Sequence, residues 1–179
     1  MGALLAFSRG IDAMNERFGR VADYCVLAAC LISAGNATVR YLFSYSTNGL
    51  LEIQWYLFGA VVLLGASYTL QKNEHVRVDL LYMMLSSRGR LWLDTFGLVL
   101  ILIPTSIYLT ALCWPFFWQA FVSDEVSQNA GGLTLWPAKL LLPLGFALLV
   151  AQGVSELIKR VAALRGDISI ETDYEKPLQ

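Results

Sequence analysis

Residues 52–79 read EIQWYLFGAVVLLGASYTLQKNEHVRVD, and this stretch determines the class of the protein. It opens on the carboxylate of Glu52, continues without a charged side chain as far as Gln71, and ends on three alternating polar residues, His75, Arg77 and Asp79. About 20 predominantly apolar residues are enough for a helix to cross the ~30 Å hydrocarbon core of a bilayer. In lipid the backbone amides must be hydrogen-bonded within the segment, so we expect a transmembrane helix here.

The composition of the whole chain is also that of a membrane protein. Hydrophobic residues make up 56% of the 179 residues and charged residues 15%, whereas soluble domains contain roughly 45–50% and 25%. The mean hydropathy is +0.55. The 13 basic and 14 acidic side chains nearly cancel, so the chain lacks the basic field that would indicate nucleic acid as a partner.

Four segments of the chain reach the length and apolar character of a membrane span. We predict an all-α integral membrane protein in which one four-helix domain, residues 1–165, precedes a polar tail, residues 166–179. The N-terminal segment, residues 1–20, has an apolar run at residues 3–7 that is too brief for a signal sequence, and we predict that this segment forms a short interfacial helix leading into the membrane. The predicted spans are residues 21–43, 52–70, 91–114 and 135–158.

Basic residues are distributed unevenly around these spans. Of the 13 Lys and Arg residues, all except Arg40 and Lys139 lie before the first span, between the second and third, or after the fourth. Loops rich in Lys and Arg remain in the cytoplasm. We therefore predict that both termini and the polar tail are cytoplasmic, and that the segments joining the first span to the second and the third to the fourth lie outside.

The segment between the second and third spans, residues 74–87, has charged residues near its start and apolar residues along most of its length. We predict that it lies along the cytoplasmic surface as an amphipathic segment. Its polar side chains then meet the lipid headgroups, a structural position, and no second titratable group completes a catalytic set, so we do not predict an enzyme. The candidate residues for the two membrane rims are His75, Arg77, Asp79, Trp136 and Lys139.

A row of small residues in the first span is a candidate contact with another helix. Ala29, Ser33 and Ala37 recur every four residues, so they line one helix face and allow a second backbone to approach closely. Such rows are common in membrane helices and indicate packing without identifying the partner.

Two charged residues flank the first outside loop at about the same predicted depth. Arg40 and Glu52 either form an ion pair there or each reach water independently. Trp55 lies beside them, at a depth that suits the aromatic belt of a membrane protein. We include these three residues among the candidates for a partner interface.

The sequence contains no recognisable cofactor or metal site. Cys25, Cys30 and Cys113 lie in apolar runs without the spacing of a zinc site, and His75 is the only histidine, so two imidazoles cannot hold a haem. We expect proline to bend the third and fourth helices at Pro104 and Pro143. The central portions of all four spans lack ionisable residues, which indicates a membrane scaffold and not a subunit with its own substrate or ion site.

Two long stretches resemble a known family. Residues 52–82, EIQWYLFGAVVLLGASYTLQKNEHVRVDLLY, and residues 125–160, EVSQNAGGLTLWPAKLLLPLGFALLVAQGVSELIKR, are similar to the small, DctQ-like membrane subunit of tripartite ATP-independent periplasmic (TRAP) transporters. The likeness extends over nearly the whole chain from the first span to Arg160. The alternatives are the membrane anchor of a quinone-linked enzyme, which would need cofactor ligands, and a small autonomous transporter or channel, which would need polar pore residues.

The resemblance implies partners that this chain does not contain. It implies a large, DctM-like membrane subunit that holds the substrate and sodium sites, and a soluble, DctP-like periplasmic binding protein for organic acids. The chain itself would be a scaffold in the inner membrane of a bacterium, without a cofactor of its own. The acidic residues of the second outside loop, Asp124 and Glu125, would then lie close to the docked binding protein.

Overall fold

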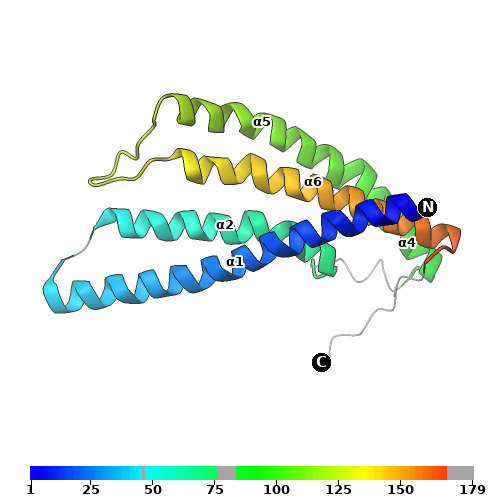
Figure 1. Cartoon of the computed structure of the whole chain (residues 1–179), viewed down its shortest axis with the longest axis horizontal. Helices are drawn as coiled ribbons and strands as arrows, with labels where there is room; N and C mark the ends of the chain where they lie inside the picture. Colours follow the sequence, from blue (N-terminus) through cyan, green and yellow to red (C-terminus); the bar gives the residue numbers. More distant parts are fainter. Residues whose placement is uncertain (46, 76–83, 169–179) are drawn as a thin grey trace.

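The computed structural model describes residues 1–45, 47–75 and 84–168, and over these residues it is helical (Figure 1). Outside the helices, the described residues contain one β-type backbone pairing, an isolated antiparallel bridge between Val126 and Thr134. The helices are α1 (Gly2–Phe43), α2 (Asn48–Lys72), α4 (Ser87–Gly97), the π-helical turn η1 (Leu98–Leu102), α5 (Ile103–Val122) and α6 (Trp136–Arg165).

The prediction of four apolar spans is confirmed. The candidate membrane spans are Gly2–Phe43, Asn48–Lys72, Ser87–Val122 and Trp136–Arg165, the third consisting of α4, η1 and α5 without a break. Each span is longer than the predicted segment. The extra turns are the more polar ends of the helices, which a hydropathy window excludes although they continue the same hydrogen-bonded backbone.

The prediction of a separate interfacial helix before the first span is wrong, because α1 is one helix of 42 residues. Its first half is amphipathic, and Ser8, Ile11, Asn15 and Gly19 are buried at intervals of three and four residues. This buried stripe packs against neighbouring helices of the bundle. At about 1.5 Å per residue α1 is roughly 63 Å long, so it extends well beyond a ~30 Å hydrocarbon core.

The helices form two antiparallel hairpins that lie side by side (Figure 1). Helix α1 pairs with α2, α5 pairs with α6, and α2 contacts α6 between the two hairpins. The first half of α1 also crosses α6. We call the end of the bundle with Ser44, Thr47 and residues 123–135 the loop end, and the end with Met1, α4 and Arg165 the terminal end.

Two glycines of α6 allow its neighbours to approach closely. A Cβ atom on Gly145 would lie 2.7 Å from Cβ of Leu63 and 2.8 Å from the Leu63 carbonyl oxygen. A Cβ atom on Gly153 would lie 2.9 Å from a methyl group of Leu102, in the π-helical turn. Helix α6 is therefore the central helix of the bundle, in contact with α1, α2, α4 and α5.

The π-helical turn lies directly before Pro104, one of the two prolines expected to bend a helix. Proline has no amide hydrogen and its ring collides with the preceding turn of an α-helix. A π-helical turn shifts the hydrogen bonding by one residue, so the chain continues into α5 without ending the span. Pro143 lies inside α6, as predicted, and Pro115 inside α5.

Candidate functional site

The centre of the terminal end is a buried amide, that of Gln152 in α6. Gln152 Oε1 accepts a hydrogen bond from Asn15 Nδ2 at 2.7 Å, and its Nε2 donates to Asp12 Oδ1 at 2.9 Å and to Glu156 Oε1 at 3.1 Å. Gln152 and Asn15 have no exposed surface. A polar side chain inside a membrane bundle is stabilised when its donors and acceptors are satisfied by other helices. Here α1 supplies two of the three partners of Gln152, Asn15 and Asp12, and Glu156 of α6 itself supplies the third.

Two serines extend this contact between α1 and α6. Ser155 Oγ donates to Asp12 Oδ1 at 2.8 Å and lies 2.7 Å from Ser8 Oγ. Both serines are buried, with at most 1% of their surface exposed. The polar residues of α1 at positions 8, 12 and 15 therefore lie on one helix face and meet α6.

Charged side chains complete the cluster. Lys159 Nζ lies 2.8 Å from Asp12 Oδ2 and 2.7 Å from Glu156 Oε1. Arg160 donates from Nε to Asp94 Oδ2 at 3.2 Å and from an Nη atom to Glu156 Oε2 at 2.5 Å. Ions at such a depth are tolerated when they are paired and hydrogen-bonded, and here each carboxylate has a cationic partner.

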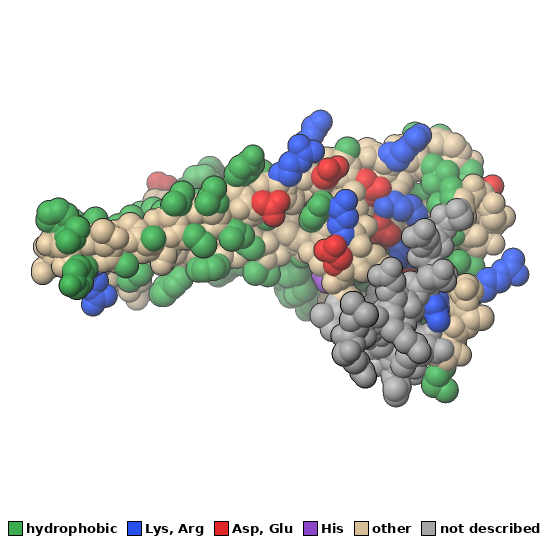
Figure 2. Space-filling view, turned by 90° about the horizontal axis from the view of Figure 1, so that it is seen from below, with side chains coloured by type: hydrophobic (Ala, Val, Ile, Leu, Met, Phe, Trp, Pro, Cys, Tyr) green, Lys and Arg blue, Asp and Glu red, His purple; other side chains and the backbone are tan. Residues whose placement is uncertain are grey.

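We call these residues the terminal network, and it joins α1, α4 and α6. Its members are Ser8, Asp12, Asn15, Asp94, Gln152, Ser155, Glu156, Lys159 and Arg160. On the face in Figure 2 charged side chains gather at this end of the molecule, while the elongated remainder is mostly hydrophobic. Because most of its groups bond to each other, the network holds the three helices together. Among the described residues, no group of three His, Cys, Asp or Glu side chains could hold a metal ion.

At the loop end a single carboxylate holds the loop between α5 and α6. Glu52, in the first turns of α2, is only 4% exposed. It accepts hydrogen bonds from Ser127 Oγ, from Asn129 Nδ2 at 2.7 Å and from the Leu133 amide at 2.8 Å. Three donors from one loop fix that loop against the start of α2.

Further contacts give the same loop a defined shape. The Ser127 amide donates to the Leu133 carbonyl and the Leu135 amide to the Glu125 carbonyl, both at 2.9 Å. Lys139, near the start of α6, forms an ion pair with Glu125 and lies 4.0 Å from the centre of the Phe116 ring. The loop is therefore a packed part of the bundle. Asp124, by contrast, is exposed.

Glu52 and Arg40 do not form an ion pair in the structure, although both are described. The sequence suggested this pair because the two residues flank a short loop, but Glu52 finds three donors in a loop 75 to 81 positions further along the chain. Arg40 lies instead beside a cavity between α1 and α2.

The structure separates the row of small residues in α1. Ala29 is buried, with 3% exposure, whereas Ser33 and Ala37 are exposed and line the cavity between α1 and α2. Trp55 is 66% exposed on the surface of α2. Of this row, only Ala29 is therefore buried in a contact within the chain.

The predicted rim residues that the structure describes lie at the two ends of the bundle. His75 is exposed just beyond α2, and Trp136 begins α6, where its ring lies 5.6 Å from that of Phe121. Arg77, Asp79 and most of the predicted amphipathic segment lie outside the described residues. At about 1.5 Å per residue, Glu156 lies roughly 30 Å along α6 from Trp136, which is about one hydrocarbon thickness.

Sequence analysis missed the terminal network. The available signal was the spacing of Ser8, Asp12 and Asn15, which places three polar side chains on one face of a helix, together with a second polar face on α6. Two polar faces at the same end of a bundle predict a contact. A membrane-surface helix at residues 1–20 would have no contact with α6, so the prediction of such a helix excludes this network.

Comparison with protein families identifies the family of the four-helix chain. A family model described as "Tripartite ATP-independent periplasmic transporters, DctQ component" matches residues 29–163, about three quarters of the chain. The match begins within α1 and ends within α6, so it includes both hairpins. Searches of curated proteins and of solved structures gave no significant match.

Proposed function

The chain belongs to the DctQ component family of TRAP transporters, a family of non-enzymatic membrane transport subunits, and from this premise we propose that it is a scaffold subunit. In this proposal it binds a large, DctM-like membrane subunit and works with a DctP-like periplasmic binding protein. The assembled transporter takes up organic acids together with sodium ions across the inner membrane of a bacterium. The substrate and sodium sites belong to the large subunit.

The observation that supports this role is the distribution of ionisable groups in the four spans. Residues 24–39, 53–71, 95–123 and 140–155 contain no Asp, Glu, Lys, Arg or His. The ionisable groups of the terminal network are paired with each other, and Glu52 is bonded to the loop. A charged substrate or a sodium ion needs ligands near the middle of the membrane, and these segments lack the charged ones.

Most residues in the apolar part of each span are not buried within the chain. Within the most apolar part of each span, 11% of the residues of α1 and of the third span are buried, compared with 39% in α6. Helix α6 thus has its neighbours within the chain, whereas α1, α4 and α5 present most of their side chains outward. We propose that the large subunit covers part of this outward surface, so that the two subunits together form a wider scaffold in the membrane.

Coexpression with a cognate DctM-like subunit tests this function. We expect a tag on the chain to retain the large subunit through size-exclusion chromatography as a complex of constant stoichiometry. A chain that elutes alone would contradict the scaffold role, and a bound chromophore would instead support the anchor of a quinone-linked enzyme.

The orientation is a second part of the proposal. The excess of Lys and Arg around the terminal end supports cytoplasmic termini, with the loop end in the periplasm. In this orientation His75, Arg77 and Asp79 would contact cytoplasmic headgroups and position the complex. Reporter proteins fused after Gln179 and inserted at Gln128 should give opposite sidedness, and a periplasmic signal after Gln179 would contradict this arrangement.

The loop between α5 and α6 is the proposed docking point for the binding protein. Of its two acidic residues, Glu125 is paired with Lys139, so the exposed Asp124 is the better candidate for a contact across the interface. A charge at such a rim mainly changes the rate of encounter. A crosslinker on Ser123→Cys should capture the binding protein during transport, and capture of the large subunit alone would contradict docking here.

A further inference from the structure

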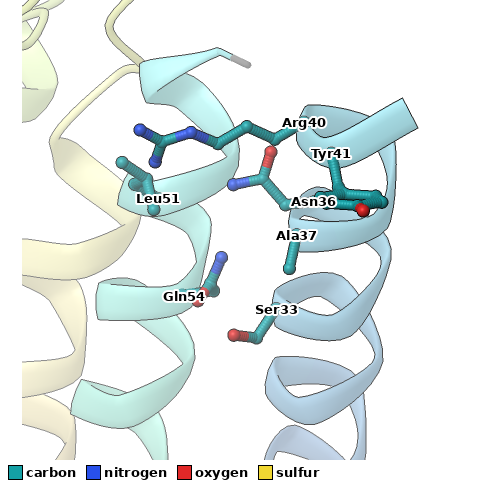
Figure 3. A pocket seen from close by; sticks show the side chains of 7 residues that line it. All are labelled: Ser33, Asn36, Ala37, Arg40, Tyr41, Leu51 and Gln54. Atoms are coloured by element: carbon teal, nitrogen blue, oxygen red, sulfur yellow. The ribbon is translucent and has the colours of Figure 1, made fainter. Parts of the chain in front are cut away.

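A cavity of about 570 Å³ lies between α1 and α2 at the loop end of the bundle. Figure 3 shows that α1 contributes five of its lining residues and α2 contributes two. The side chain of Arg40 extends across the top of the cavity toward α2, while the amide of Asn36 and the hydroxyl of Ser33 point into the space between the helices. The lining residues are Ser33, Asn36, Ala37, Arg40, Tyr41, Leu51 and Gln54.

Two polar groups of this cavity are not satisfied within the described part of the chain. Asn36 is only 9% exposed, and its Oδ1 atom has no hydrogen-bond partner there. Arg40 has no carboxylate within 4 Å among residues 1–45, 47–75 and 84–168, and Glu52 is bonded to the loop. A buried acceptor without a donor and a cation without an anion together indicate a ligand that supplies both.

The cavity lies near the depth of the lipid headgroups. Arg40 is three residues before the end of α1 at Phe43, so it is within one turn of the end of the span. Tyr41, Tyr45 and Trp55 are 88%, 62% and 66% exposed around it, as in an aromatic belt. At this depth the abundant anion is the phosphate group of a phospholipid, on either side of the membrane.

An exposed apolar stripe continues from the cavity along α2. Phe58 and Val62 follow the lining residue Gln54 at intervals of four, and they are 59% and 67% exposed. With Leu51, which is 42% exposed, they form a track parallel to the helix axis. An acyl chain attached to a headgroup in the cavity would lie along this track.

We propose that this cavity binds the headgroup of a phospholipid with one anionic phosphate and a neutral hydrogen-bond donor, the chemistry of phosphatidylglycerol. The phosphate pairs with Arg40, a glycerol hydroxyl donates to Asn36 Oδ1, and one acyl chain covers Leu51, Phe58 and Val62. Phosphatidylcholine carries the same phosphate but has no donor for Asn36, and its second charge repels Arg40. The volume is that of a small-molecule site, which is too small for a transmembrane helix about 10 Å wide.

Native mass spectrometry of the full chain in detergent tests the proposal. Dioleoylphosphatidylglycerol should bind about tenfold more tightly than dioleoylphosphatidylcholine, because the second lipid lacks the hydrogen bond to Asn36 and its choline cation repels Arg40. The preference should weaken in Arg40→Gln, which keeps Asn36, and disappear in Ala37→Phe, which fills the cavity while leaving the charge in place. It should persist in Arg9→Gln, the same change on an exposed residue near the other end of α1.

Four results would overturn the proposal. Equal binding of the two lipids to the unmodified chain would remove the headgroup preference, and an unchanged preference in Arg40→Gln would place the lipid elsewhere. Displacement of the lipid by soluble glycerol 3-phosphate would indicate a site for free phosphate esters. If the complex with the large subunit instead loses the lipid and forms a disulfide from Ala37→Cys to that subunit, the occupant is a protein side chain.

Discussion

At the terminal end of the bundle most of the polar side chains are paired with one another, whereas at the loop end two polar residues of the cavity between α1 and α2 are not. Gln152, Glu156 and Arg160 have their partners on α1, α4 and α6. Asn36 and Arg40 lack such partners among the described residues. Both groups lie near the ends of spans, so membrane depth alone does not explain the difference.

The comparison separates two uses of polarity in a membrane subunit. The terminal network stabilises the contact between helices, and of its members only Asn15 has a buried atom, Oδ1, without a hydrogen-bond partner among the described residues. An unsaturated cavity costs stability unless a further molecule fills it. We therefore expect substitutions at the terminal end to destabilise the isolated chain, and substitutions at the loop cavity to change what binds to it.

The largest effect is expected for Arg160→Met. The change removes Arg160 from its ion pairs with Glu156 and Asp94, and removing one partner of a buried ion pair costs about 3–5 kcal/mol. The free energy of unfolding in mixed detergent micelles measures this loss. The control is Arg165→Met, at the exposed end of the same helix, which should change stability by less than about 0.5 kcal/mol. Equal effects of the two variants would remove the distinction between the network and the surface.

A smaller loss of stability is expected for Gly145→Ala, which tests the close contact between α6 and α2. The added methyl group would collide with Leu63 of α2, and such overpacking costs about 1–3 kcal/mol. Gly59→Ala lies on α2, faces α6 and serves as the control, because its methyl group would be 3.9 Å from Leu141, an ordinary contact. The same unfolding measurement should separate the two glycines, and a tolerated Gly145→Ala would show that α2 and α6 are less closely packed.

The hydrogen bond between the side-chain amides of Asn15 and Gln152 should contribute less to the free energy of unfolding than either of these two contacts. A double-mutant cycle with Asn15→Leu and Gln152→Leu is expected to give a coupling of about 0.6–1.7 kcal/mol, the range found between membrane helices. Additive effects of the two changes would contradict the 2.7 Å hydrogen bond as a source of stability.

These expectations depend on contacts that the sequence could and could not predict. The four spans follow from apolar runs of sufficient length, a local property that needs no knowledge of the neighbours. The bonds from Asp12 to Gln152 and Ser155 join residues 140 and 143 positions apart, and no local pattern pairs them. Polar residues before position 21 lowered the hydropathy of the region, so a buried stripe was interpreted as a membrane-surface helix.

The pairing at the loop end illustrates the same limit. Arg40 and Glu52 are close in sequence and opposite in charge, which favoured an ion pair between them. The folded loop offers Glu52 two side-chain donors and an amide, and this set is assembled only when α5 and α6 pack beside α2. Tertiary structure therefore decides which partner a charged group takes.

The smallest stability effect is expected for Arg40→Met, the counterpart of Arg160→Met at the loop end. Without a carboxylate partner in the described residues, Arg40 should contribute less than about 0.5 kcal/mol in lipid-free detergent. The same unfolding assay measures it. A loss of stability as large as that of Arg160→Met would mean that Arg40 stabilises the loop end as Arg160 stabilises the terminal end.

The central claim is that this chain supports transport without holding substrate or sodium, and reconstitution tests it most directly. Proteoliposomes are prepared with the chain alone, with the large subunit alone, and with both, and sodium-driven uptake of an organic acid is measured after adding the binding protein. We predict uptake only when both membrane subunits are present. Uptake by this chain alone, or equal uptake by the large subunit without it, would contradict the scaffold role.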